Sequence, residues 1–585
     1  MIKRLAKCLR QYTPYAIGSP IAMIGEVTME VLIPIVMAAL IDRGVAAGNM
    51  SVVVGQGLLL VLCALCSLVF GSGSAVLASR AATGFAANLR HDMFYRVQTY
   101  DFSNIDKFST SSIVTRLTTD VANLQNAFQM CIRMAIRCPV MLVMALIMAM
   151  RISPKLCMVY LIVLPILAAA LLLIMKFTHP IFDRVFRTYD VLNNVVQENL
   201  HGVRVVKSFV REDLECRKFN TVSNTIYKMF VKAESILAGN MPIMQFCVYT
   251  CMIAISYLGA TLVVQSGNNA ALGLTTGQLG SMFTYTTQIL SSLMMLSMVF
   301  VMMTMSRAAV RRCYEVLEEI PDLPQAEHPV TEVADGSIDF DNVSFRYSAS
   351  ASKNSLDHID LHIRSGMTVG ILGGTGSSKS TLVQLIPRLY DVTEGALRVG
   401  GVDVKDYDVH ALRDQVSMVL QKNQLFSGTI KENLRWGNPN ATDEEIRHAC
   451  RLACADSFVE SFPDGYDTHI EQGGTNVSGG QKQRLCIARA LLKKPKILIL
   501  DDSTSAVDTH TDAMIRKAFR EEIPNTTKLI IAQRIASVQE SDLIIVMEDG
   551  RMSAAGTHEE LLRTSPIYRE VYESQTKGGE TECPQ

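Results

Sequence analysis

The chain has 585 residues, of which 49% are hydrophobic and 19% are charged, and its formal net charge is −1. This length exceeds what one hydrophobic core usually supports, so we expect roughly two to four structural units. The small charged fraction excludes a disordered chain, and the near-neutral charge disfavours a nucleic-acid-binding protein, which usually carries a concentrated basic surplus. Residues 235–306 contain no Asp, Glu, Lys or Arg, whereas charged residues are frequent from about residue 336 onward. We therefore expect a membrane part followed by a soluble part.

The first residues favour a helix that lies along a membrane surface. Ile2, Leu5 and Leu9 share one helical face, and basic residues surround it. Apolar stretches follow, each close to or above the length of about 20 residues that a membrane-spanning helix requires. The first of them is too long for a cleaved signal peptide, and Glu26 and Glu30 interrupt it. The six predicted spans cover residues 17–41, 52–79, 133–152, 156–175, 236–265 and 279–305.

The distribution of Arg and Lys predicts the orientation of these spans. The connections between the second and third and between the fourth and fifth spans are long and basic, whereas the opposite connections are short. The positive-inside rule then places the long connections and both termini in the cytoplasm. Because the long connections have helical patterns, we expect the membrane helices to continue into the cytoplasm. At their tips we expect short helices that touch the soluble part, at residues 103–109 and around residues 198–207.

Two features of the membrane part have alternative interpretations. Glu26 and Glu30 lie one turn apart on one helical face, and carboxylates inside a membrane are costly and often functional. They form either a wall that attracts cations or a satisfied pair that faces a watery cavity or lies near the interface, and the sequence leaves open whether they contact a substrate. The 30 Met residues are either filler of the core and lipid-facing surface or an adaptable surface for varied apolar ligands.

The soluble part contains a phosphate-binding loop. An apolar strand at residues 367–372 precedes a Gly-rich loop and a helical run from residue 382, which is the context this motif requires. Backbone N–H groups and the helix N-terminus would hold phosphates, with Lys379 as the cation and Ser380 as a Mg²⁺ ligand. Ser378 stands where the usual pattern has Gly, and we expect it to fit if it keeps a right-handed backbone conformation. The predicted nucleotide-binding residues here are Gly373, Gly374, Thr375, Gly376, Ser377, Ser378, Lys379, Ser380 and Thr381.

A second motif completes a nucleotide-hydrolase core. The apolar run at residues 496–500 ends in two carboxylates, Asp501 and Asp502, which is typical of a buried strand that presents acids at its carboxyl end. Asp501 is placed to hold Mg²⁺ through water, and Asp502 stands where a general base for the attacking water would lie. A phosphate loop alone is compatible with more than one activity, but the loop together with this acidic strand predicts nucleotide hydrolysis.

These motifs together resemble those of the ATP-binding cassette (ABC) half-transporters of exporter architecture. The segment that carries the resemblance is Val477-Ser478-Gly479-Gly480-Gln481, which is similar to the ABC signature motif. Further matches follow in the family's order. Tyr347 resembles the aromatic residue that stacks on adenine, Gln421 resembles the glutamine of the loop that senses Mg²⁺, and Ser505-Ala-Val-Asp508 resembles the D-loop.

The resemblance covers nearly the whole chain and implies its fold class. We expect a multidomain membrane protein in which an all-α six-helix transmembrane domain, with helices extended into the cytoplasm, precedes an α/β P-loop nucleotide-binding domain. The expected bounds are residues 1–316 for the transmembrane domain, 317–336 for a linker, 337–575 for the nucleotide-binding domain and 576–585 for a flexible tail.

The resemblance also implies partners and cofactors. Two cassettes close face to face on two ATP molecules with Mg²⁺, and each ATP lies between one chain's phosphate loop and the other chain's signature. One half-transporter therefore requires a second. The implied metal ligands are Ser380, Gln421 and Asp501, and the residues implied to act on the γ-phosphate across the interface are Ser478, Gly479, Gly480 and Gln481.

Two departures from the family's pattern fall on catalytic positions. Asp502 stands where the family usually has Glu, so its carboxylate is one methylene short, and a misplacement of about 1 Å can cost on the order of 100-fold in rate. Gln533 stands where the family usually has His, and an amide cannot carry a positive charge or relay a proton. We therefore expect the site built on this chain's own phosphate loop to bind ATP and hydrolyse it poorly.

The retained signature predicts an asymmetric heterodimer, in which this chain completes a competent site on its partner. The partner would carry Glu and His at the matching positions. A slow homodimer is the alternative.

The expected function is ATP-driven export of amphipathic compounds, either drugs or lipids. The expected partners are therefore a hydrophobic small-molecule substrate and the lipid bilayer. The alternatives are a siderophore-type importer with exporter architecture and a mainly regulatory ATP-binding subunit. A nucleic-acid partner is not expected, because soluble repair or translation ATPases lack six hydrophobic spans. We expect the chain in the plasma membrane of a bacterium.

Overall fold

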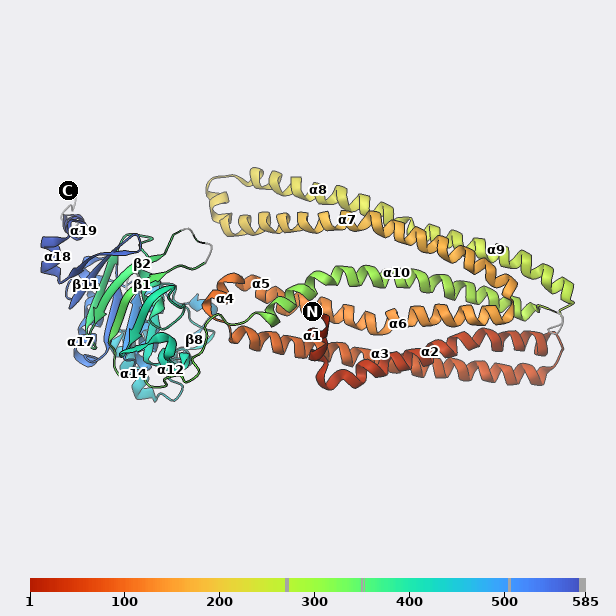
Figure 1. Cartoon of the computed structure of the whole chain (residues 1–585), viewed down its shortest axis with the longest axis horizontal. Helices are drawn as coiled ribbons and strands as arrows, with labels where there is room; N and C mark the ends of the chain where they lie inside the picture. Colours follow the sequence, from red (N-terminus) through yellow and green to blue (C-terminus); the bar gives the residue numbers. More distant parts are fainter. Residues whose placement is uncertain (269–272, 349–350, 352, 503–506, 578–585) are drawn as a thin grey trace. The chain divides into compact units, whose positions relative to one another are not determined.

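The computed structural model describes residues 1–585 except 269–272, 349–350, 352, 503–506 and 578–585. The chain divides into two compact units (Figure 1). The first comprises Met1–Gln98 and Thr110–Glu319, and the second comprises Thr99–Ser109 and Ile320–Gln585.

The first unit is helical. The described residues contain 6 helical segments long and apolar enough to cross a membrane, of 43 to 55 residues each, and they include all the predicted spans. A span needs only about 20 residues, so these helices continue well beyond their apolar parts. The helices are α1 (Ile2–Ala6), α2 (Thr13–Ala39), α3 (Met50–Gln98), α5 (Thr110–Thr115), α6 (Val121–Ile152), α7 (Pro154–Ser208), α8 (Glu212–Ala238), α9 (Asn240–Ser266) and α10 (Thr276–Glu318).

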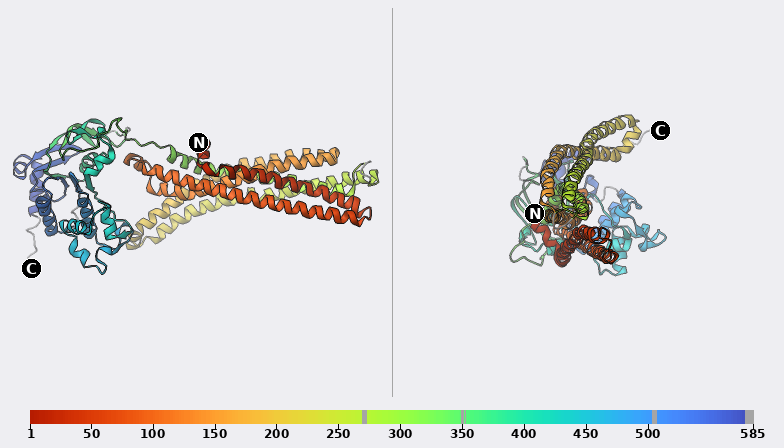
Figure 2. Two further views of the ribbon diagram at one scale, coloured as in Figure 1. Left: turned by 90° about the horizontal axis from the view of Figure 1, so that it is seen from below. Right: turned by 90° about the vertical axis from the view of Figure 1, so that its right-hand side faces the viewer.

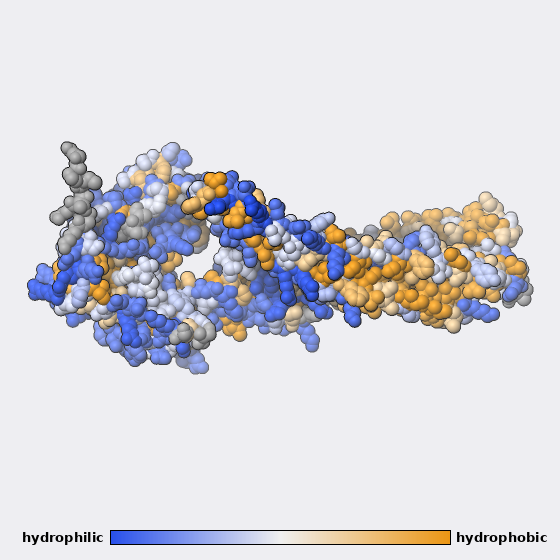
Figure 3. Space-filling view, turned by 90° about the horizontal axis from the view of Figure 1, so that it is seen from above, coloured by the Kyte–Doolittle hydropathy of each residue, from blue (hydrophilic) through white to orange (hydrophobic). Residues whose placement is uncertain are grey.

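Local sequence explains where several of these helices begin. Ser153 precedes a proline and takes an extended conformation, with φ of −153° and ψ of 106°, which ends α6 and lets α7 start at Pro154. Thr275 and Gln278 form a reciprocal capping box at the start of α10. Figure 3 shows apolar side chains gathered toward the end of the helical unit where α2 turns into α3, and polar side chains toward its other end. This pattern matches a helix bundle that is only partly in lipid.

The prediction of a second short tip helix is wrong. Residues 198–207 form the last turns of α7, which runs unbroken to Ser208, and α8 starts at Glu212 after a tight turn. The run 198–207 contains no Gly–Pro break strong enough to stop a helix, since Gly202 alone costs only about 1 kcal/mol in a helix. The pair α7 and α8 lies side by side and diverges from α2, α3 and α6 toward its turn (Figures 1 and 2).

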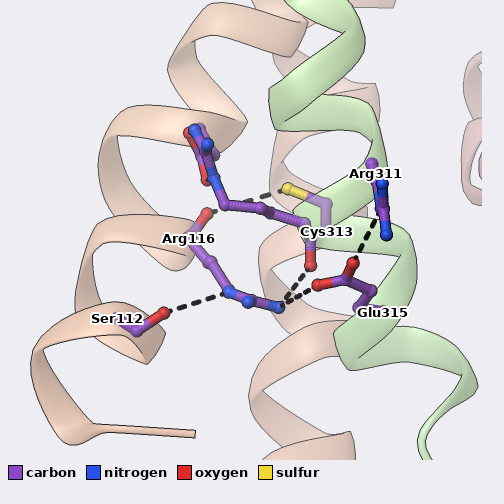
Figure 4. A network of polar contacts seen from close by, with 7 residues as sticks. Ser112, Arg116, Arg311, Cys313 and Glu315 are labelled. Carbon is purple, nitrogen blue, oxygen red and sulfur yellow. Dashed lines mark hydrogen bonds and ion pairs between the residues drawn. The ribbon is translucent and has the colours of Figure 1, made fainter. Parts of the chain in front are cut away.

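Polar contacts hold the last turns of α10 against the segment before α6 (Figure 4). Arg116 is 8% exposed, and its Nη1 atom donates to the carbonyl oxygen of Arg312 over 2.8 Å and pairs with Glu315 over 3.2 Å. The Arg312 side chain pairs with Asp120, whose exposed fraction is 1%. Because the Asp120 carboxylate is buried while the Arg312 side chain is 44% exposed, loss of the arginine would leave a buried charge without its partner. The last turns of α10 are therefore held against the segment before α6, just before the chain enters the second unit.

The second unit is an α/β structure with two larger sheets. A six-stranded sheet has the order β12-β11-β3-β10-β9-β6, with every neighbouring pair parallel except β11 and β12. A four-stranded antiparallel sheet has the order β2-β1-β4-β5, and β7 pairs with β8. The strands are β1 (Ile338–Phe345), β2 (Leu356–Ile363), β3 (Thr368–Gly373), β4 (Glu394–Val399), β5 (Val402–Asp403), β6 (Val416–Val419), β7 (Gly428–Thr429), β8 (His469–Ile470), β9 (Ile497–Asp501), β10 (Thr527–Ile531), β11 (Leu543–Glu548) and β12 (Arg551–Gly556).

Helices cover these sheets, and the central strands are almost wholly apolar and buried. Such near-continuous apolar runs are typical of parallel strands covered on both faces. The helices are α4 (Phe102–Lys107), α11 (Lys379–Leu385), α12 (Val409–Gln415), α13 (Ile430–Arg435), α14 (Asp443–Leu452), α15 (Asp456–Glu460), α16 (Gly479–Leu492), α17 (Thr509–Glu522), α18 (His558–Thr564) and α19 (Pro566–Lys577).

Helix α4 confirms the predicted tip helix at residues 103–109 that touches the soluble part. It comes from the connection between α3 and α5, yet it packs within the second unit. The hydroxyl of Tyr390 donates to the Asp106 carboxylate over 2.7 Å, and the Tyr390 ring meets Phe102 with centroids 6.1 Å apart. Asn104 donates to the carbonyl oxygen of Ile320 over 3.1 Å.

Candidate nucleotide site

The phosphate loop leaves the carboxyl end of β3 in the middle of the six-stranded sheet and leads into α11. Gly373 lies so close to the carbonyl oxygen of Met547 that a Cβ atom there would overlap it, which explains the glycine. The Lys379 ammonium turns back into the loop and donates to the carbonyl oxygens of Gly373 and Gly374 over 2.9 and 2.7 Å. The ammonium also lies 3.3 Å from the Ser377 hydroxyl. The predicted loop residues occupy the segment from the end of β3 to the first turn of α11: Gly373, Gly374, Thr375, Gly376, Ser377, Ser378, Lys379, Ser380 and Thr381.

The condition under which Ser378 was expected to fit, a right-handed backbone conformation, is not met. Ser378 has φ of 68° and ψ of 25°, which lies in the left-handed region rather than the right-handed one. The loop must bring the chain from the strand into α11 at this residue, and the usual glycine makes that turn without a Cβ penalty. For an L-residue the same conformation costs roughly 1–2 kcal/mol. The serine is therefore accommodated with backbone strain.

Asp501 ends β9, a buried strand between β10 and β6, and its side chain reaches the start of α11. The carboxylate Oδ1 atom accepts a hydrogen bond of 2.9 Å from the Ser380 hydroxyl. Burial raises the pKa of the Asp501 carboxyl, against the hydrogen bond from Ser380, while the charge of Asp502 adds to the rise. Burial also lowers the pKa of the Lys379 ammonium, which the two aspartates oppose.

This donor set fits a magnesium nucleotide. A hydroxyl and a carboxylate oxygen are hard ligands, and Mg²⁺ in nucleotide sites usually takes one or two protein ligands and completes its shell with phosphate and water oxygens. The Lys379 ammonium and the α11 N-terminus supply positive charge for phosphates. When bound, Mg²⁺–ATP would bring a phosphoanhydride to be hydrolysed, held by Ser380 and Asp501 at the metal and by the loop at the phosphates.

The side chains of two glutamines from separate loops meet the Asp502 carboxylate. The Gln533 side-chain amide donates to the Asp502 Oδ2 atom over 2.8 Å, and the Gln421 amide lies 3.5 Å from the same oxygen. The Asp502 backbone is fixed as well, because its carbonyl oxygen accepts from the Gln483 side chain over 3.3 Å and its N–H donates to Ile531 over 3.1 Å. The structure therefore brings together Asp502, Gln533 and Gln421, which the sequence singled out separately.

Tyr347 lies beside α11, and its ring packs against the rings of Phe345 and Tyr390. Its hydroxyl is 3.0 Å from the Thr381 hydroxyl, and its half-exposed ring meets Tyr390 edge-on, with centroids 5.1 Å apart and an interplanar angle of 88°. Burial raises the pKa of the Tyr390 phenol, and its hydrogen bond to Asp106 adds to the rise. Sequence reasoning did not identify Tyr390. An isolated tyrosine soon after the phosphate-loop helix was the one signal available.

The signature residues lie at the start of α16. Ser478 caps this helix: its hydroxyl accepts from the Gln481 N–H over 3.3 Å, while the Gln481 side chain accepts from the Ser478 N–H over 2.9 Å. Ser478 and Gly479 are exposed, and Gly480 and Gln481 are half-exposed. In the described ranges these hydrogen bonds join Ser478 and Gln481 to each other and not to the phosphate loop.

The D-loop falls partly outside the described residues. Ser505 and Ala506 lie in the undescribed range 503–506. Val507 is 5% exposed, and the Asp508 carboxylate caps α17 by accepting from the Thr511 N–H over 2.9 Å.

Comparisons with known proteins agree with this geometry. Residues 17–308 match the family described as the ABC transporter transmembrane region, and residues 356–505 match the family described as ABC transporter. YfiB, an uncharacterized ABC transporter ATP-binding protein of Bacillus subtilis, is 34% identical over 98% of this chain and 98% of its own length. The ATP-dependent lipid A-core flippase of Desulfotalea psychrophila is 30% identical over 86% of each chain.

A solved structure is similar over nearly the full length. The structure of a bacterial Atm1-family ABC exporter with ATP bound has a TM-score of 0.82 and covers 99% of both chains at 24% identity, which shows the fold. The predicted fold class is confirmed: long apolar helices of an exporter-type transmembrane domain precede an α/β ABC nucleotide-binding domain.

Proposed function

The chain belongs to the ABC transporters as an exporter-type half-transporter that dimerises and couples ATP to export, and from this premise we propose that it is the weakly hydrolysing subunit of a heterodimer. Its own phosphate loop, Gln421, Asp501 and Asp502 bind Mg²⁺–ATP and cleave it slowly. Its signature completes the competent site on the partner.

The observation that supports this division of labour is the 2.8 Å hydrogen bond from the Gln533 amide to Asp502. A general base must accept a proton from the attacking water, and a donor held on its oxygen occupies a position that the water would need. The Gln533 amide offers a hydrogen bond but has no proton to exchange and no positive charge to place on the γ-phosphate. The shorter Asp502 side chain and Gln533 therefore act in the same direction.

The second observation that supports the heterodimer is that the signature residues form an intact and exposed helix N-terminus. Ser478 and Gln481 cap α16 and remain at the surface of the second unit. An intact helix N-terminus with two glycines offers backbone N–H groups to an anion, which is the chemistry that a partner's γ-phosphate requires. The chain thus keeps the signature that would complete the partner's ATP site, whereas Asp502 and Gln533 in its own ATP site differ from the family's usual residues.

The proposed cargo is an amphipathic compound, a drug or a lipid, taken from the bilayer. The similarity to the lipid A-core flippase supports a lipid-like cargo, and the many methionines of the membrane unit suit varied apolar ligands. We place the chain in the plasma membrane of a bacterium with both termini in the cytoplasm.

The test is ATP hydrolysis by this chain purified alone in lipid, beside a preparation co-expressed with the half-transporter with which it co-purifies. Activity near background alone and robust activity together would support the heterodimer. Equal activity per cassette in both preparations would refute it.

A further inference from the structure

The membrane unit contains a cavity of about 570 Å³ between α2, α6 and α10. Its wall combines thioether and aliphatic side chains with polar groups. The polar residues on which the inference depends are Glu30, Arg137 and Gln288, and the apolar ones are Ile33, Met134, Met141 and Met295. A mixed wall of this kind suits an amphipathic molecule.

Glu30 and Arg137 of this wall belong to an ion cluster whose third member, Glu26, is not among the residues that line the cavity. The Arg137 Nη2 atom lies 2.8 and 2.7 Å from the two carboxylate oxygens of Glu30, and its Nη1 atom lies 2.5 Å from the Oε1 atom of Glu26. The contacts support the interpretation of Glu26 and Glu30 as a satisfied pair, since one guanidinium pairs with both carboxylates. The three side chains together carry one formal negative charge. Both terminal nitrogens of Arg137 are engaged, so an anionic group would find them occupied.

Two acceptor oxygens of this cluster lack hydrogen-bond partners within the described part of the chain: Oε2 of Glu26 and Oε1 of Gln288. Glu26 is 9% exposed, and a Cβ atom on Gly71 would lie 3.1 Å from its Oε2 atom, so the glycine leaves room for the carboxylate. Unsatisfied acceptors in the apolar part of a membrane protein are costly.

The backbone explains why the Gln288 oxygen is the free end of its amide. Pro34 has no N–H, so the carbonyl oxygen of Glu30, four residues earlier, loses its helical partner. The Gln288 nitrogen donates to that carbonyl over 3.4 Å. The amide is thereby oriented with its nitrogen toward α2, and its buried oxygen is left without a hydrogen-bond partner among the described residues.

We propose that this cavity binds an amphipathic ligand through a cationic, hydrogen-bond-donating group placed against Glu30 and Gln288. The apolar part of the ligand lies against Met134, Met141 and Met295. This inference rests on the proposed export of amphipathic compounds and narrows their class to amphiphiles that carry an amine.

The test measures binding without nucleotide, to the full chain in lipid nanodiscs, together with its partner where one co-purifies. The probes are a dansyl-labelled dodecylamine, its N-acetylated form and the matching carboxylate, each corrected with empty nanodiscs. We expect the amine to bind about tenfold more tightly than the other two, the size of one charge-assisted contact. Equal binding of the three probes would overturn the proposal.

Variants locate the site. Glu30→Gln removes the net charge and should weaken amine binding about tenfold while leaving the acetylated probe within about twofold. Gln288→Leu should weaken the amine as well, and it leaves the Arg137 cluster intact should Glu30→Gln fail to fold. Glu234→Gln, an exposed carboxylate on α8, is the matched control and should change nothing. An unchanged amine preference in both cavity variants would refute the site.

The two proposals fail separately. Because binding is measured without ATP, loss of the amine preference with the expected hydrolysis pattern refutes only the ligand class. The expected amine binding with equal hydrolysis by the chain alone refutes only the heterodimer.

Discussion

The side-chain amide of Gln533 donates a hydrogen bond of 2.8 Å to the Oδ2 atom of Asp502. These residues come from the ends of neighbouring parallel strands, β10 and β9, so their meeting follows from the sheet order. A shortened acid and an uncharged amide thus form one unit rather than two unrelated substitutions.

The first prediction concerns this pair. In the assembled transporter, the double variant Asp502→Glu with Gln533→His should raise hydrolysis at this chain's site on the order of 10- to 100-fold, because it restores both the reach of the base and a protonatable group. Single-turnover hydrolysis with the partner's site inactivated measures it. Gln539→His, on the exposed surface nearby, is the control. A double variant as slow as the natural pair would show that the defect lies elsewhere.

The second prediction uses the strain at Ser378. Ser378→Gly should stabilise the nucleotide-binding domain by about 1 kcal/mol, because glycine adopts positive φ without a Cβ penalty. Ser461→Gly is the matched control: Ser461 is exposed and right-handed with φ of −76°, so the same change there should destabilise by about 0.5–1 kcal/mol. Denaturant unfolding measures both. Equal effects of the two variants would argue against strain at the loop.

The third prediction concerns Tyr390, which connects the Tyr347 ring to α4. Tyr390→Phe keeps the rings in contact but removes the hydrogen bond to Asp106, worth about 1 kcal/mol. Hydrogen exchange in residues 99–109 should become roughly fivefold faster, with ATP affinity within about twofold. Because the pKa of Tyr390 is raised, the phenol stays a donor across the working pH range. Unchanged exchange would show that the bond does not hold α4.

The fourth prediction follows from the raised pKa of Asp501. A folded-state pKa above the unfolded value means that the folded domain loses stability as pH rises through it, so Asp501→Asn should stabilise the nucleotide-free domain at neutral pH. The same variant should weaken Mg²⁺–ATP binding, since the amide supplies no charge. In the natural chain that binding should fall with decreasing pH earlier than for an ordinary aspartate. Thermal unfolding and nucleotide titration across pH measure both effects, and a destabilised variant would contradict the sign.

Contiguous motifs were the part of this protein that the sequence predicted best. The strand, loop and helix around Lys379 are adjacent in the chain. The length of each of the six apolar stretches can be counted directly in the sequence, which is enough to predict a membrane span. What the sequence could not predict depends on tertiary placement. The left-handed backbone conformation of Ser378 is set by the way β3 leads into α11. The pairing of Arg137 depends on the packing of α6 against α2, and the contact between Tyr347 and Tyr390 depends on the positions of two loops. The end of α7 was misjudged because a tip helix and a continuing helix have the same local pattern.

The division of labour between the two ATP sites is tested most directly by two single variants of this chain in the assembled transporter. Ser478→Ala alters the signature given to the partner's site, and Lys379→Ala alters the phosphate loop of this chain's own site. We predict that Ser478→Ala removes nearly all steady-state hydrolysis and that Lys379→Ala leaves most of it. Equal loss in both variants, as in a homodimer with two equivalent sites, or loss with Lys379→Ala alone, would contradict the proposed function.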